Sequence, residues 1–213
     1  MSGPLKGEPP ALWDPVVRLT HWALAVVVIG NALITRPGGA THAWLGWIGA
    51  GVLILRLGWG LVGAREARFS AFPPRPRAAL GHMAYLVAGR PGSYVSHNPA
   101  GAVMVYALWA SLGLVIQTGM MLTGFATPVE IAAQKAAVAS GDWASLAAGT
   151  ASGLSRETRH LLGDVHAVMA NLMLVLAVAH VAGVALESAA MKRNLVRPML
   201  LGARDKGVTA QRQ

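Results

Sequence analysis

Four long apolar segments dominate this chain, and they restrict its fold more than any other feature. The segments run over about 15–35, 42–63, 99–126 and 157–190. Each is long enough to cross a bilayer core of roughly 30 Å, which takes about 20 helical residues. The apolar runs are continuous rather than alternating, and a membrane span must satisfy its backbone polar groups internally. The sequence therefore predicts an all-α membrane protein, a four-transmembrane-helix bundle.

Residues at the segment ends support this prediction. Asp14–Pro15 and Asn98–Pro99 each combine an N-cap residue with a proline at the first helical position. Thr41 is a plausible cap for the second segment. The short 36–41 link makes the first two helices antiparallel neighbours.

The two longer links differ in character. The 64–98 link is basic and proline-rich, and its part from His82 to Val95 is expected to form either a short surface helix or irregular structure at the headgroups. The 127–156 link is rich in Ala, Ser and Gly and is interpreted as a loop. Since no internal repeat or soluble domain is evident, residues 1–213 are expected to form a single membrane domain.

Cationic residues indicate the orientation of the bundle. Thirteen fall in the N-terminus, the 64–98 link and the C-terminal tail: Lys6, Arg18, Arg65, Arg68, Arg75, Arg77, Arg90, Lys192, Arg193, Arg197, Arg204, Lys206 and Arg212. Four fall on the opposite side: Arg36, Lys135, Arg156 and Arg159. Because cytoplasmic loops carry the excess of Lys and Arg, both termini and the 64–98 loop are expected in the cytoplasm and the 127–156 loop in the periplasm.

Composition excludes several classes of protein. The chain is 54% hydrophobic and only 13% charged, against about 25% in soluble domains. Cysteine is absent, which excludes disulfides, iron–sulfur clusters and covalently attached c-type haem. The net charge of +9 follows the topology pattern, so nucleic-acid binding is not expected. The polar N-terminus and the missing A-x-A site give no sign of a cleavable signal peptide.

Four histidines fall at two depths of the predicted bundle. His21 is near the cytoplasmic start of the first helix and His42 near the periplasmic start of the second. His166 and His180 are fourteen residues apart on the last helix. That spacing is about 21 Å along a helix and returns to within about 40° of the same face. Depth therefore pairs His42 with His166 outside and His21 with His180 inside.

Two facing histidines at each of two levels is the arrangement that clamps two haem irons. An alternative interpretation remains, in which the histidines bind no metal and each is interfacial or hydrogen-bonded in the core. Zinc or copper could also use histidines, but no cysteine or carboxylate accompanies them, so porphyrin fits better than a tetrahedral metal. His82 and His97 are interpreted as interfacial or capping residues.

Arg56 is a charged residue inside a predicted membrane span, where burying its charge costs free energy. It follows His42 by fourteen residues, hence on the same face but near the cytoplasmic side. One interpretation is a bidentate partner for a propionate of the inner haem. The alternative is an arginine that extends to the headgroups.

Several stretches resemble the bacterial cytochrome b561 / nickel-hydrogenase b-type cytochrome family. They are WDPVVRLTHW (13–22), HAWLGW (42–47), RLGWGLVG (56–63), ARFSAF (67–72), HNPAGA (97–102), HAVMANLMLVLAVAHVAG (166–183) and ESAAMKRNLVRPML (187–200). The resemblance implies a four-helix membrane cytochrome with two b haems. Carried over by motif, its ligands are His21, His42, His166 and His180, the four that depth selects.

The resemblance also implies a function. The chain would pass electrons across the bacterial inner membrane between the quinone pool and a redox partner, such as a periplasmic c-type cytochrome, a hydrogenase or a dehydrogenase of a respiratory chain. An electron-transfer subunit is favoured over a stand-alone quinol oxidoreductase. The alternative from another class is a non-redox membrane protein, either a small transporter or an assembly subunit that binds metal through histidine.

Overall fold

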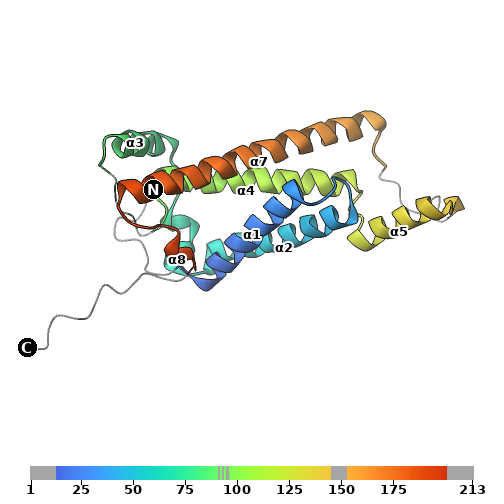
Figure 1. The fold of residues 1–213 in the computed structure, drawn as a ribbon, viewed down its shortest axis with the longest axis horizontal. Coiled ribbons are helices and arrows are strands. Elements are labelled where there is room, and N and C mark those ends of the chain that lie inside the picture. The colour runs from blue at the N-terminus through green and yellow to red at the C-terminus, as the bar shows by residue number, and fades with distance from the viewer. Residues whose placement is uncertain (1–12, 91, 93, 95, 145–152, 201–213) are drawn as a thin grey trace, which may run out of the picture. The chain divides into compact units, whose positions relative to one another are not determined.

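The structure is a computed structural model that describes residues 13–90, 92, 94, 96–144 and 153–200. The regular elements of these residues are helices (Figure 1). Four of them are long and apolar enough to cross a membrane: α1 (Pro15–Leu33), α2 (Ala40–Val62), α4 (Pro99–Leu122) and α7 (Arg156–Ala190). The predicted all-α architecture with four spans is confirmed for the described part of the chain.

Shorter helices occupy the links and the C-terminal side. The 3-10 turns η1 (Arg65–Ala67) and η2 (Phe69–Ala71) and helix α3 (Pro76–Val87) lie between α2 and α4. Helix α5 (Pro128–Ser140) follows α4, and α8 (Arg197–Leu200) follows α7.

The chain divides into two compact units. Unit 1 comprises Met1–Leu19, Gly58–Tyr106 and Val178–Gln213, and unit 2 comprises Thr20–Leu57 and Ala107–Ala177. The four long helices each contribute residues to both units.

Two predicted caps are present in unit 1. The Asp14 carboxylate accepts hydrogen bonds from the backbone N–H groups of Val16 and Val17, at 2.9 and 3.1 Å. The Asn98 side chain accepts one from Gly101 N–H at 2.7 Å. These contacts satisfy donors that the first turn of a helix leaves without an intrahelical partner.

Side chains near Asp14 also connect distant segments of unit 1. Trp59 donates its indole N–H to the Asp14 carboxylate at 2.9 Å. The Arg18 guanidinium donates to the carbonyls of Met199 and Leu200, at 3.3 and 2.7 Å. These bonds join α1 to α2 and to the α8 segment within this unit.

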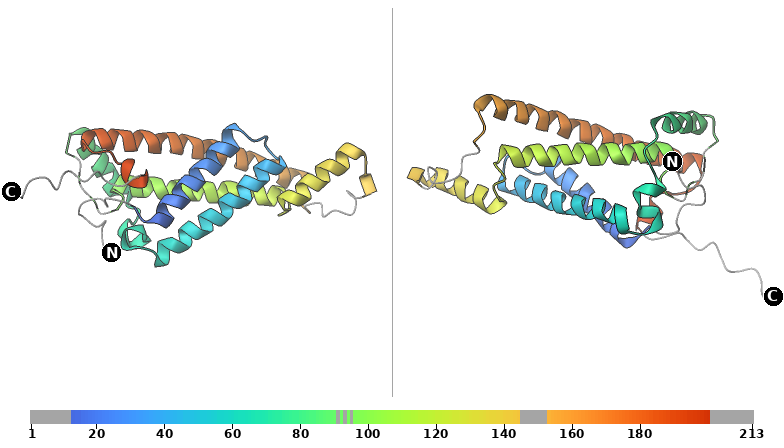
Figure 2. Two further views of the ribbon diagram at one scale, coloured as in Figure 1. Left: turned by 60° about the horizontal axis from the view of Figure 1, so that its bottom comes forward. Right: turned by 180° about the vertical axis from the view of Figure 1, so that it is seen from behind.

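In Figure 1 and in the right-hand view of Figure 2, α3 lies beside the last turns of α7.

Unit 2 contains the apolar core. Leu24, Leu53, Leu112 and Met173 form one buried cluster, and each comes from a different long helix. The turn between α1 and α2 is short, as predicted, and Figure 1 shows it. The Asn31 side chain donates to the His42 carbonyl across this turn, at 3.3 Å.

Helix boundaries differ from the prediction in unit 2. Helix α2 begins at Ala40, and Ala43 N–H donates to the Gly39 carbonyl, so Thr41 lies in the first turn and is not the cap. Helix α4 ends at Leu122 rather than 126, because Gly124 and Phe125 adopt left-handed φ angles of 62° and 61°.

The 127–156 link is not simply a loop, and this is the main correction to the predicted fold. Thr127 and Glu130 form a reciprocal capping box at the start of α5, with Pro128 in the first turn. The Thr127 backbone N–H donates to the Glu130 carboxylate and lowers the pKa of that group. Gly141, with φ of 72°, ends the helix. Residues 145–152 of the link lie outside the described residues.

Candidate functional site

Two of the predicted ligands face each other in unit 2. His42 lies in the first turn of α2 and His166 in α7, and their ring centres are 6.1 Å apart. A metal–imidazole nitrogen bond of about 2 Å, plus about 1 Å from each nitrogen to its ring centre, separates two rings across one metal ion by roughly 6 Å. The 6.1 Å spacing of the two ring centres therefore matches that of two imidazoles with one metal ion between them.

The His166 ring is oriented by a hydroxyl on α4. Thr118 Oγ1 lies 3.0 Å from His166 Nδ1 and also donates to the Leu114 carbonyl at 2.7 Å. A hydroxyl has one proton, so the Thr118 oxygen acts as acceptor for an Nδ1–H group. This tautomer carries its lone pair on Nε2, the nitrogen that can ligate a metal.

His42 has a matching arrangement. Thr35 Oγ1 lies 3.2 Å from His42 Nδ1, and it also lies within donor distance of the Asn31 carbonyl at 3.2 Å and of the Asn31 side-chain oxygen at 3.0 Å. When Thr35 donates its proton to Asn31, its oxygen accepts from Nδ1–H of His42. Both rings of the pair then present Nε2 as the ligating nitrogen.

Close approach of α4 to α7 depends on Gly119. A Cβ atom placed on Gly119 would lie 3.1 Å from Cε1 of His166, which is tighter than most real Cβ contacts. The missing side chain leaves room for the imidazole beside α4. Gly119 thus contributes shape to the site without a polar group.

His21 belongs to unit 2 and His180 to unit 1. His21 is half-buried in α1, and its ring lies edge-on to Trp22 at 5.1 Å. His180 is half-buried in α7, fourteen residues after His166 and so on nearly the same helix face. Their pairing stays a prediction.

Arg56 is buried inside unit 2. Its side chain is only 4% exposed, and its guanidinium lies 4.8 Å from the centre of the Trp109 ring on α4. A cation over an indole face is a favourable contact. This burial argues against an arginine that extends along the helix to the headgroups.

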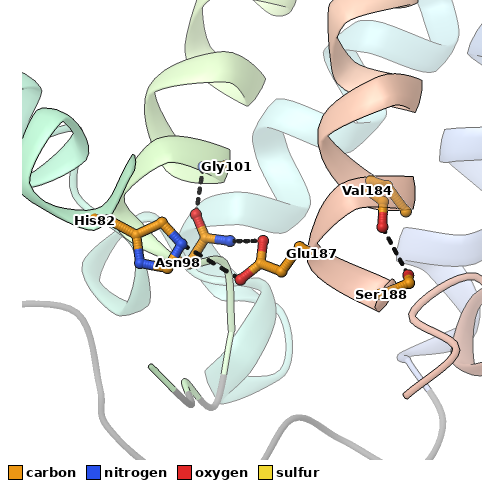
Figure 3. A network of polar contacts seen from close by, with 6 residues as sticks. All are labelled: His82, Asn98, Gly101, Val184, Glu187 and Ser188. Atoms are coloured by element: carbon orange, nitrogen blue, oxygen red, sulfur yellow. Dashed lines mark hydrogen bonds and ion pairs between the residues drawn. The ribbon is translucent and has the colours of Figure 1, made fainter. Parts of the chain in front are cut away.

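Sequence reasoning missed a buried polar cluster in unit 1, shown in Figure 3. His82 Nε2 of α3 lies 3.4 Å from the Glu187 carboxylate of α7, and the Asn98 side chain donates to the other oxygen of that carboxylate. His82 is 5% exposed and Glu187 8%, so both are buried within the protein, and His82 contacts a carboxylate instead of capping a helix. The available signal was a glutamate seven residues after His180, near the end of the predicted 157–190 segment.

His97 also differs from the prediction. Its ring packs against Trp13 and Phe72 in unit 1, with ring centres 5.3 and 4.8 Å apart. Phe72 is fully buried. His97 is therefore a half-buried member of an aromatic cluster and does not cap α4, where Asn98 makes the cap contact.

A cluster of three or more His, Cys, Asp or Glu side chains suited to a metal ion is not found among the described residues. A porphyrin supplies four nitrogens itself and takes axial ligands from the protein, so a facing pair such as His42 and His166 is the appropriate protein contribution. The residues present fit a haem.

Comparison with known proteins agrees with this chemistry. Neither a curated protein nor a solved structure matches the chain. The profile of the family described as prokaryotic cytochrome b561 matches residues 12–202, nearly the whole chain. The chain therefore belongs to the prokaryotic cytochrome b561 family, whose members are multi-pass membrane cytochromes that bind b-type haem and transfer electrons.

Proposed function

We propose that this chain is a di-haem cytochrome b of the bacterial inner membrane, organised as a single membrane domain, that carries electrons between the quinone pool and a redox partner protein. The observation that carries the proposal is the facing His42–His166 pair, whose ring centres are 6.1 Å apart and whose Nδ1 atoms each lie within hydrogen-bond distance of a threonine hydroxyl. This pair would hold the outer haem. His21 and His180 would hold the inner haem.

Spacing along α7 supports two haem levels. His166 and His180 are separated by fourteen residues, or about 21 Å of helix, and they lie on nearly the same face. Met173, midway between them, is 7% exposed and packs in the unit 2 core, so this face is directed inward there. A ligand at each end of the stripe places one redox centre toward each membrane surface.

Haem supplies one-electron redox chemistry when bound, and the protein determines where it operates. The four histidines would hold the haem iron, and the two threonines would fix the tautomer and ring orientation of the outer pair. Arg56 would balance the charge of an inner propionate carboxylate. The apolar helices exclude water around these groups.

Quinone is the proposed electron carrier on one side because it is soluble in the lipid. The chain has no cysteine and so offers no iron–sulfur cluster as an alternative electron entry point. A periplasmic c-type cytochrome, a hydrogenase or a dehydrogenase would exchange electrons at the other level.

Reaction with a quinol tests the proposed function. When purified holoprotein is mixed with a soluble quinol analogue in a stopped-flow spectrometer, the b-type α band is expected to appear, and a quinone is expected to reoxidise the reduced protein. Dithionite provides the control for complete reduction. Haems that stay oxidised under quinol and reduced under quinone would favour a conduit between two protein partners.

We also propose that both termini lie in the cytoplasm. Thirteen cationic residues fall on the terminal side and four on the other, although Lys6, Arg204, Lys206 and Arg212 are outside the described residues. Because cysteine is absent, a single Ser140→Cys variant gives a clean labelling site at the end of α5. An impermeant maleimide is expected to label it from the periplasm in spheroplasts. Labelling only after the cytoplasm is opened would reverse the orientation.

A further inference from the structure

The proposed electron transfer does not account for the protons that a quinol releases. Unit 1 contains a buried acid–base pair that is not among the proposed haem ligands. Glu187 and His82 come from α7 and α3 and are 8% and 5% exposed. Burying ionisable groups is costly unless they are paired, so such groups within a membrane protein are functional candidates by default.

Geometry holds the carboxylate between two partners. Figure 3 shows Asn98 and His82 approaching different oxygens of Glu187. Asn98 is itself anchored, because its side-chain oxygen accepts the Gly101 N–H at 2.7 Å. Asn98 has no titratable proton and fixes the position of the carboxylate, whereas His82 can exchange a proton with it.

Glu187 also occupies a specific place on α7. It follows His180 by seven residues. This spacing is about 10 Å along the helix axis, and the rotation falls short of two full turns by only about 20°. The carboxylate and the predicted inner ligand therefore share one helix face. A proton released near the inner haem level would have a buried base two turns away.

Helix α3 connects that base to the exposed surface of unit 1. His82 is buried, but the neighbouring residues Met83, Ala84 and Tyr85 of α3 are exposed. The ring of Tyr94 lies 5.7 Å from the His82 ring and is a further titratable group facing it. The order along the path is thus Glu187, His82 and then the exposed flank of α3.

We propose that Glu187 and His82 form a proton-transfer pair that accepts the protons of a quinol as its electrons pass to the inner haem; this rests on the proposed function. Oxidation of one quinol yields one quinone, two electrons and two protons. Each electron reduces one ferric iron to ferrous iron, in succession. Each proton binds the Glu187 carboxylate, passes to the His82 imidazole and leaves to water on the α3 side, so the pair is used twice per quinol.

Glu187→Gln tests the pair, because glutamine keeps the shape and the hydrogen bond from Asn98 but cannot accept a proton. Reduction by a soluble quinol analogue is expected to slow by about 100-fold or more, the usual contribution of a general base, and to lose its wild-type dependence on pH. Reduction by dithionite, which delivers no proton through the site, and the haem spectrum are expected to be unchanged. His82→Gln should slow the same step, and Glu187→Asp should restore part of it.

An infrared difference spectrum gives a readout that does not depend on turnover. Reduction of the wild-type holoprotein by quinol is expected to produce a protonated-carboxyl band that is missing in Glu187→Gln. Glu157→Gln is the matched control, because Glu157 is an exposed carboxylate at the other end of the same helix; it should behave as wild type.

The outcomes separate this inference from the proposed function. If quinol reduces wild type and Glu187→Gln equally fast with the same pH profile, the pair is not the proton acceptor and the proposed function stands. If Glu187→Gln and His82→Gln instead lose haem or slow dithionite reduction equally, the pair is structural. If quinol fails to reduce wild type, both proposals fall together.

Discussion

His166→Ala is expected to remove one of the two proposed haems completely, and His42→Ala is expected to remove the same one. The centres of the two rings are 6.1 Å apart, so loss of either would leave the outer haem with one protein ligand in place of two. Haem quantitation should fall by half in both variants. Redox titration should show the same component missing, with the other unchanged.

Thr118→Val provides a graded companion to these variants. Valine keeps the shape of threonine but removes the acceptor for the His166 Nδ1 proton, and loss of such a partner typically weakens metal binding by about 10–100-fold. The outer haem should be retained less tightly and titrate at a shifted potential. Thr123→Val is the matched control, since its hydroxyl donates to the Met120 carbonyl on the same helix. Loss of different haems in His42→Ala and His166→Ala would show that depth pairs the ligands wrongly.

Much of the architecture could be predicted because membrane spans are specified locally. A continuous apolar run, Asp14 or Asn98 as cap and a following proline are read from neighbouring residues. The helix ends moved where backbone conformation decided them, as at Gly124 and Phe125 with their positive φ angles. Helix α5 was missed although Thr127, Pro128 and Glu130 carry the capping-box pattern, because the Ala-rich link lacks an apolar face that would identify a span.

The proximity of the His42–His166 pair could also be predicted, since depth follows from helix direction and residue count. The groups that orient its rings could not. Thr118 is 48 residues from His166 in sequence, and their contact depends on how α4 packs against α7 in unit 2. The same holds for Gly119, whose small size matters only because an imidazole lies beside it.

Glu187 and His82 show the limit most clearly. They are separated by 105 positions in sequence, and α3 would have to be placed before the contact could be inferred. A histidine in a basic, proline-rich link is ordinarily interfacial, which is why the sequence favoured that interpretation. The carboxylate in an apolar helix was the stronger local signal, because an acid within a span rarely lacks a function.

At the inner level, His21→Ala and His180→Ala are each expected to remove the second haem and to stop electron transfer across the membrane. Both variants should retain the outer haem, because neither His21 nor His180 takes part in the Thr35–His42 and Thr118–His166 contacts. Haem quantitation with redox titration measures the loss. Reduction of an external acceptor by quinol in proteoliposomes measures the break in the path.

Arg56→Leu gives the graded test at this level. The guanidinium is buried over Trp109, where a neutral side chain of similar bulk can pack, so the fold should persist. Removing the charge should shift the inner potential or weaken inner-haem retention without changing the outer component, and Arg56→Lys should restore only part because lysine lacks the planar fork. Arg36→Leu is the control for a general loss of positive charge, because Arg36 is an exposed residue within the α1–α2 turn. If redox titrations of Arg56→Leu match wild type, Arg56 has a packing role alone. For the histidine variants, loss of the outer haem in His21→Ala would place His21 at the outer level.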